Sequence, residues 1–159
     1  MLIIACCSMV GLFQAARLRV RTTRLEETIG LVGMIASDLR YTCAPMENIV
    51  RRLTSVSDAL PFLTACAEYT QKGEPFPNAW RQALKEAPSG LDEEDVKILR
   101  KLGLTLGAVD LDGALSELDY AKFALGKRYE EARERQRKLG GLYRTLGVLA
   151  GFAIVIVLF

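Results

Sequence analysis

The C-terminal end of the chain, residues 112–159, reads DGALSELDYAKFALGKRYEEARERQRKLGGLYRTLGVLAGFAIVIVLF. Its first part is densely charged, whereas residues 142–159 carry a single charge, Arg144, near their start. As a helix, residues 142–159 rise about 27 Å, close to the ~30 Å of a hydrocarbon core. The stretch therefore predicts one long helix that begins in water and ends as a C-terminal transmembrane segment, residues 142–159. The alternative is a buried C-terminal helix of a soluble protein.

A second apolar run, residues 1–16, opens the chain. No basic residue precedes it and no small-residue cleavage site follows it, so it does not resemble a signal peptide. As a helix it spans about 22 Å, which is short for a bilayer, and a start codon a few residues upstream would lengthen it. We expect an N-terminal transmembrane segment at residues 1–16. A core helix or an interfacial helix is the alternative.

Basic residues follow the first apolar run and precede or begin the second one. Lys and Arg beside a membrane span are retained on the cytoplasmic side. The pattern predicts that both termini lie outside, that residues 17–141 form a cytoplasmic domain, and that the cations contact anionic lipid headgroups, each contributing about 1 kcal/mol near the surface. The membrane-flanking basic residues are Arg17, Arg19, Arg21, Arg24, Arg133, Arg135, Arg137, Lys138 and Arg144.

Between the two apolar runs, the hydrophobic spacing is helical nearly throughout. Leu25, Ile29, Val32, Ile35 and Leu39 recur in steps of three and four, which places them on one face of a helix. No run alternates as a strand does, and no long linker divides the chain. The sequence predicts an all-α fold, a compact bundle of about six helices between two transmembrane helices, with the first and last helices side by side.

The composition excludes several kinds of chemistry. The net charge of +2 and the lack of a basic face with interleaved aromatics argue against nucleic acid. Histidine is absent, which removes the commonest general base and metal ligand. We expect no enzyme activity, no cofactor and no metal site. Cys6 and Cys7 lie in an apolar run; a disulfide between Cys43 and Cys66 stays open, although reduced thiols are expected.

Several residues are expected to be structural. The acids of residues 92–95 suit the positive end of a helix dipole, and consecutive helical residues do not converge on a metal. Gly103 and Gly107 are four residues apart on an apolar helix, which favours close helix packing. Trp80 is expected to anchor the core.

The order and spacing of several segments resemble the stage III sporulation protein AB family of endospore-forming bacteria. The chain departs from the family at Ala114, where a glutamine is usual, and this departure removes any polar role there. The segments that carry the resemblance are residues 13–16 (FQAA), 41–46 (YTCAPM), 79–84 (AWRQAL), 102–110 (LGLTLGAVD) and 146–151 (LGVLAG).

The resemblance implies a function that composition does not show. The family is similar to the platform protein F of type II secretion and type IV pilus systems, and it belongs to the channel-like apparatus between mother cell and forespore. It implies a structural scaffold in the mother-cell membrane whose helical domain docks an assembly ATPase and other apparatus proteins. Whether the chain forms a homo-oligomer stays open. The alternative function is a small membrane subunit of a transporter or channel complex.

Charge and position suggest where such a partner binds. Exposed acids are expected at the start of the fifth helix and in the turn before the last one. The candidate partner-binding residues are Glu93, Glu94, Asp95, Asp110 and Asp112.

Overall fold

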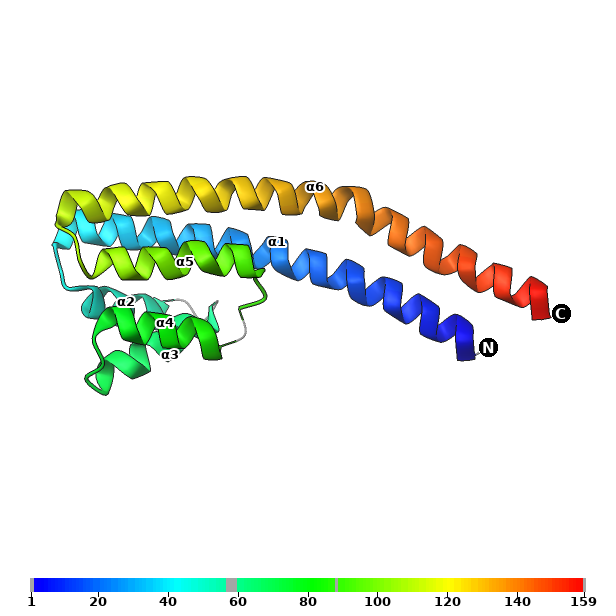
Figure 1. Ribbon diagram of the computed structural model, residues 1–159, viewed down its shortest axis with the longest axis horizontal. Helices are drawn as coiled ribbons and strands as arrows, with labels where there is room; N and C mark the ends of the chain where they lie inside the picture. The colour runs from blue at the N-terminus through cyan, green and yellow to red at the C-terminus, as the bar shows by residue number, and fades with distance from the viewer. Residues whose placement is uncertain (1, 57–59, 88, 159) are drawn as a thin grey trace. The chain divides into compact units, whose positions relative to one another are not determined.

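The computed structural model describes the backbone of residues 2–56, 60–87 and 89–158, and the side chains of residues 13, 16–55, 60–87 and 89–138. The described residues form six helices and no strand, so the predicted all-α class and helix number are confirmed (Figure 1). The helices are α1 (Leu2–Thr42), α2 (Met46–Val56), α3 (Pro61–Gln71), α4 (Phe76–Glu86), α5 (Glu93–Leu106) and α6 (Leu111–Leu158).

The chain divides into two units. One unit is continuous in sequence, Arg24–Arg128, and holds the C-terminal half of α1, all of α2 to α5 and the start of α6. The other unit joins the chain up to Thr23 with the chain from Tyr129 onward. The division into units does not test the predicted cytoplasmic domain at residues 17–141, because that prediction concerns where the chain enters the membrane.

Within the Arg24–Arg128 unit, α5 lies between the long helices and the short ones (Figure 1). On one side α1 and α6 run side by side, and a Cβ built on Gly33 would lie 3.9 Å from Nζ of Lys122. On the other side α2, α3 and α4 pack in succession, with α4 against α5. The side-by-side placement of the first and last helices, expected from the sequence, is confirmed in this unit.

The core of this unit follows the predicted spacing. Leu25, Val32, Ile35 and Leu39 of α1 are buried, whereas Ile29 is half-buried at the edge of the apolar face. Four apolar residues of α2 are buried as well: Met46, Ile49, Val50 and Leu53. An apolar stripe of this width stabilises a helix by its burial rather than by intrinsic propensity.

Trp80 of α4 anchors the packing of the short helices against α5, as predicted. Its side chain is 1% exposed, and its indole Nε1 donates a hydrogen bond to the backbone oxygen of Leu99 at 2.8 Å. Phe62 meets the indole edge-on at 5.3 Å between ring centroids. Because a buried indole N–H needs a partner, this bond fixes the orientation of Trp80 against α5.

Gly103 of α5 and Gly107, the residue that follows α5, have the predicted packing role. A Cβ on Gly103 would lie 2.1 Å from Cδ1 of Trp80, and a Cβ on Gly107 would lie 2.3 Å from Cγ of Pro77. Both distances are far below van der Waals contact, so only glycine lets α5 approach α4 this closely.

The second unit contains the predicted membrane segments. The backbone is helical from Leu2 in α1 and up to Leu158 in α6. Among the described residues, no helix has an apolar stretch long enough to cross a bilayer. The two predicted spans, residues 1–16 and 142–159, lie almost wholly outside the described side chains.

The basic residues near the predicted spans differ in exposure. Arg17 and Arg19 are exposed, as are Arg133, Arg135, Arg137 and Lys138, which have side chains free to face solvent or headgroups. Arg21 is buried, and Arg24, in the first unit, donates to Glu27 at 2.8 Å. Arg21 thus differs from its exposed neighbours, and the contact of the basic flank with lipid headgroups stays a prediction. Arg144 lies outside the described side chains.

The two described cysteines are free thiols with opposite environments. Cys43 is exposed, with a φ of 48° in the left-handed region, at the end of α1. Cys66 is buried in α3, and burial, assisted by the carboxylate of Glu47, raises the pKa of its thiol from 9.0 to about 12. A thiol must ionise to react, so burial and this pKa both protect Cys66.

At pH 8 we therefore expect iodoacetamide to alkylate Cys43 and to leave Cys66 unmodified in a Cys6→Ala/Cys7→Ala variant of the full chain. Because folding raises the pKa of the Cys66 thiol, the neutral thiol stabilises the folded state fully below about pH 9. This stabilisation is lost as the pH rises toward 12. Peptide mass spectrometry measures the modification, and unfolded chain is the control in which both thiols react. Equal rates in the folded chain would contradict the prediction.

Candidate functional site

The acidic stretch at the start of α5 is a helix cap. Asp92 is the N-cap residue, and its backbone N–H donates to Oδ2 of Asp95 at 3.1 Å, while its own side chain accepts from the backbone of Asp95. This reciprocal pair is a capping box, which satisfies two backbone donors at the positive end of the helix. Among the described residues, no group of three or more Cys, Asp and Glu side chains is placed to hold a metal ion.

Asp95 is not an exposed acid. Its side chain is 0% exposed, and its Oδ1 accepts a charge-assisted hydrogen bond from Nε of Arg128 on α6 at 2.8 Å. The expectation that Asp95 is an exposed acid is therefore wrong. The side chain at position N3 of a capping box turns back toward the start of its helix. In this chain that direction places the carboxylate of Asp95 against α6.

Glu93 and Glu94 are exposed, as predicted. Glu94 accepts from Nζ of Lys97 at 2.7 Å, one turn along α5. The hydrogen bond and the attraction between the two charges lower the pKa of Glu94 and raise the pKa of Lys97. Exposed pairs of this kind contribute little to stability, and they leave Glu94 partly neutralised toward a partner.

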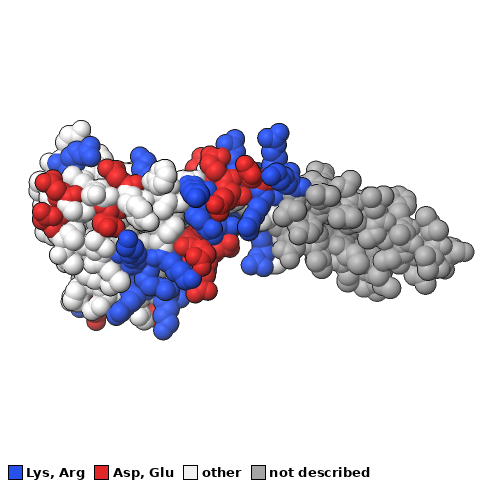
Figure 2. All heavy atoms as spheres, turned by 45° about the horizontal axis from the view of Figure 1, so that its top comes forward, with Lys and Arg blue, Asp and Glu red and all other residues white. Residues whose placement is uncertain are grey.

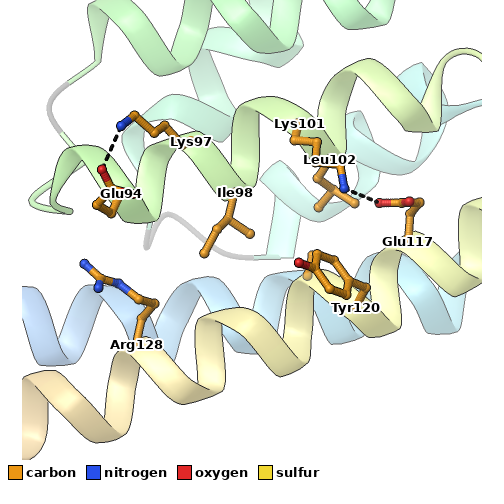
Figure 3. A pocket seen from close by; sticks show the side chains of 9 residues that line it. Glu94, Lys97, Ile98, Lys101, Leu102, Glu117, Tyr120 and Arg128 are labelled. Atoms are coloured by element: carbon orange, nitrogen blue, oxygen red, sulfur yellow. Dashed lines mark hydrogen bonds and ion pairs between the residues drawn. The ribbon is translucent and has the colours of Figure 1, made fainter.

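A shallow groove runs between α5 and α6 beside this pair (Figure 3). Its volume is about 260 Å³, and Ile98 and Leu102 of α5 line it together with Tyr120 of α6. Nζ of Lys101 lies 3.9 Å from a carboxylate oxygen of Glu117 and 5.0 Å from the centroid of the Tyr120 ring. The charges of this groove are thus matched within the groove itself.

A second pocket, which we call the end pocket, lies where α1 ends, α2 begins, and the α5–α6 turn passes. Its volume is about 270 Å³. Leu39, Met46, Leu106, Val109 and Leu111 line it together with Asp110, and its exposed surface is polar and apolar in about equal parts. The sequence did not predict this pocket.

Asp110 and Asp112 flank the start of α6. The side chain of Asp110 caps the helix, because its Oδ1 accepts from the backbone N–H of Gly113 at 3.1 Å. Asp112 lies in the first turn of α6. Both carboxylates are exposed, and Asp110 lines the end pocket. The structure therefore places Asp110 at the end pocket, and Asp112 follows two residues later, outside the residues that line it.

The predicted acids do not form one site. Glu93 and Glu94 begin α5, whereas Asp110 and Asp112 follow its end, and a helix of this length separates them by roughly 20 Å. The end pocket instead brings together residues 41–46 and 102–110, two segments that carry the family resemblance. In the sequence, each of these two segments shows apolar residues beside a helix-ending residue, Pro45 or Gly107. This pattern does not show that the two segments meet in the folded chain.

Acidic and basic side chains are interspersed on the face drawn in Figure 2, and the described residues of this face carry no broad field of one sign. Long-range steering by one charged surface is therefore weak on this side. Recognition on this face depends on local contacts.

Comparisons with known proteins agree with this architecture. A solved structure of a protein named stage III sporulation protein AB superposes with a TM-score of 0.67 and 17% sequence identity, over 75% of this chain and 98% of that chain, which shows the same fold. No curated protein sequence matches the chain closely enough to count as a relative. The sequence model of the family described as stage III sporulation protein AB matches residues 1–159. The chain therefore belongs to the stage III sporulation protein AB family.

Proposed function

We propose that this chain is a membrane-anchored scaffold of a secretion-like apparatus between mother cell and forespore, and that its helical domain docks an assembly ATPase and other apparatus proteins. Membership of a sporulation protein family over the whole chain is the observation that carries the proposal. The Arg24–Arg128 unit adds a compact helical body with exposed acids and surface pockets. Such a body suits docking rather than turnover.

The anchoring rests on the apolar runs at residues 1–16 and 142–159, with their basic flanks. In this proposal the runs cross the mother-cell membrane, and the helical domain lies in the cytoplasm, where the ATPase is accessible. The exposed cations at Arg17, Arg19 and Arg133 contact anionic headgroups.

Topology is tested by cysteine labelling. Ser55 is exposed at the end of α2, whereas Ser89 is buried and accepts from the backbone N–H of Leu91. We expect Ser55→Cys, in a variant whose four native cysteines are alanine, to react with a membrane-impermeant maleimide only after cell lysis. Ser89→Cys is the matched control that reacts slowly in both conditions because it is buried. Labelling of Ser55→Cys in intact cells would place the domain outside and exclude docking to a cytoplasmic ATPase.

A further inference from the structure

We propose that the end pocket is the docking site for a basic, aliphatic segment of the partner protein. One aliphatic side chain of that segment enters the pocket, and an adjacent Lys or Arg binds the carboxylates of Asp110 and Asp112. The inference rests on the proposed function, because the partner is the assembly ATPase named there, and it adds the surface and the chemistry of recognition.

The rim of the pocket exposes apolar side chains that a folded chain normally buries. Val109 is 41% exposed and Leu111 is 39% exposed, and both line the cavity. Tyr41, two residues before Cys43 and outside the pocket lining, is 83% exposed. Contiguous apolar surface rimmed by polar groups marks interaction sites, whereas single exposed residues do not. The rim therefore presents apolar surface that a partner would bury.

The end pocket has room for one aliphatic side chain. Its volume of about 270 Å³ is close to the 260 Å³ of the α5–α6 groove, so the residues around the pocket, and not its size, set it apart. It is open at the surface, and the buried side chains of Leu39, Met46 and Leu106 are among those that line it. Protein interfaces are anchored by a few side chains in pockets of this kind.

The charge at the pocket selects a cation. Asp110 uses one oxygen to cap α6, and neither Asp110 nor Asp112 takes part in an ion pair with a described side chain. The helix N-terminus carries about half a positive charge, which offsets only part of the two carboxylate charges. The remaining negative charge complements Lys or Arg and repels acidic segments.

Two other candidate surfaces lack this combination. At the start of α5, Asp95 is buried against Arg128, and Glu94 is paired with Lys97. In the α5–α6 groove, Lys101 lies near Glu117, so the charges balance. Neither surface joins exposed carboxylates without ion pairs to a pocket with exposed aliphatic side chains at its rim.

The test compares two charge-neutralised variants of the full chain, reconstituted in lipid nanodiscs, for binding of the purified assembly ATPase. Asp110→Asn/Asp112→Asn removes the two charges, and asparagine at position 110 still caps α6. The matched control, Glu93→Gln/Glu94→Gln, removes two charges at the other end of α5. We expect the first variant to bind at least tenfold more weakly than the original chain at low salt, and the control to bind unchanged.

Three outcomes are distinguishable. Equal binding by Asp110→Asn/Asp112→Asn and the original chain would overturn the end-pocket inference and leave the proposed function standing. No ATPase binding by the original chain would overturn the proposed function and the inference with it. If the variant fails to fold, a second experiment uses the original chain. Cys43 lines the pocket and is exposed, so the bound ATPase is expected to protect it from iodoacetamide. Alkylation of Cys43 in the complex at the rate of the free chain would overturn the inference.

Discussion

Replacing Arg128 with alanine is expected to lower the free energy of unfolding by about 3–5 kcal/mol. The substitution removes the cation that contacts Oδ1 of Asp95 at 2.8 Å and leaves that carboxylate fully buried. Replacing Asp95 with alanine is expected to cost less through the ion pair, because the Arg128 side chain is 27% exposed and can turn to water. It also removes half of the capping box, which adds about 1 kcal/mol.

Thermal unfolding of the full chain in detergent, followed by circular dichroism, measures these effects. The double variant Asp95→Ala/Arg128→Ala is expected to lose less stability than the sum of the single variants, since neither charge is then buried alone. Lys97→Ala, which breaks the exposed pair with Glu94, is the control and should leave the melting temperature unchanged. Additive losses in the double variant would show that the pair contributes no coupling.

Replacing Gly103 with alanine is expected to lower the free energy of unfolding by about 3 kcal/mol, at the upper end of typical overpacking effects. The added Cβ would lie 2.1 Å from Cδ1 of Trp80. The indole cannot move away cheaply, because its Nε1 is bonded to Leu99 and its ring packs edge-on against Phe62. The cost therefore includes either the loss of that hydrogen bond or the separation of α5 from α4.

Gly30→Ala is the matched control. Gly30 lies in the interior of α1, and a Cβ built there meets no atom within 4 Å. The same substitution should raise the free energy of unfolding by about 0.5–1 kcal/mol, because alanine loses less backbone entropy in a helix. Opposite shifts of the melting temperature are the expected result, and a rise for Gly103→Ala would contradict the packing role of that glycine.

The cap at α5 shows how far local chemistry carries a prediction. Residues 92–95 were expected to begin a helix, and the structure confirms it, because an N-cap and a dipole act within one turn. The exposure of Asp95 was predicted incorrectly. Its burial depends on Arg128, which lies far along the chain, and no local pattern records which helix covers another.

From the sequence alone we could predict the all-α class, about six helices, the buried faces of α1 and α2, and the packing role of Gly103, Gly107 and Trp80. Each of these follows from spacing along one helix or from the size of one side chain. The contact of Asp95 with Arg128, the burial of Arg21, and the pocket between residues 43–46 and residues 106–111 are features of the folded chain that the sequence did not reveal. These features depend on contacts between helices remote in sequence, and periodicity identifies which face of a helix is buried but not which partner buries it.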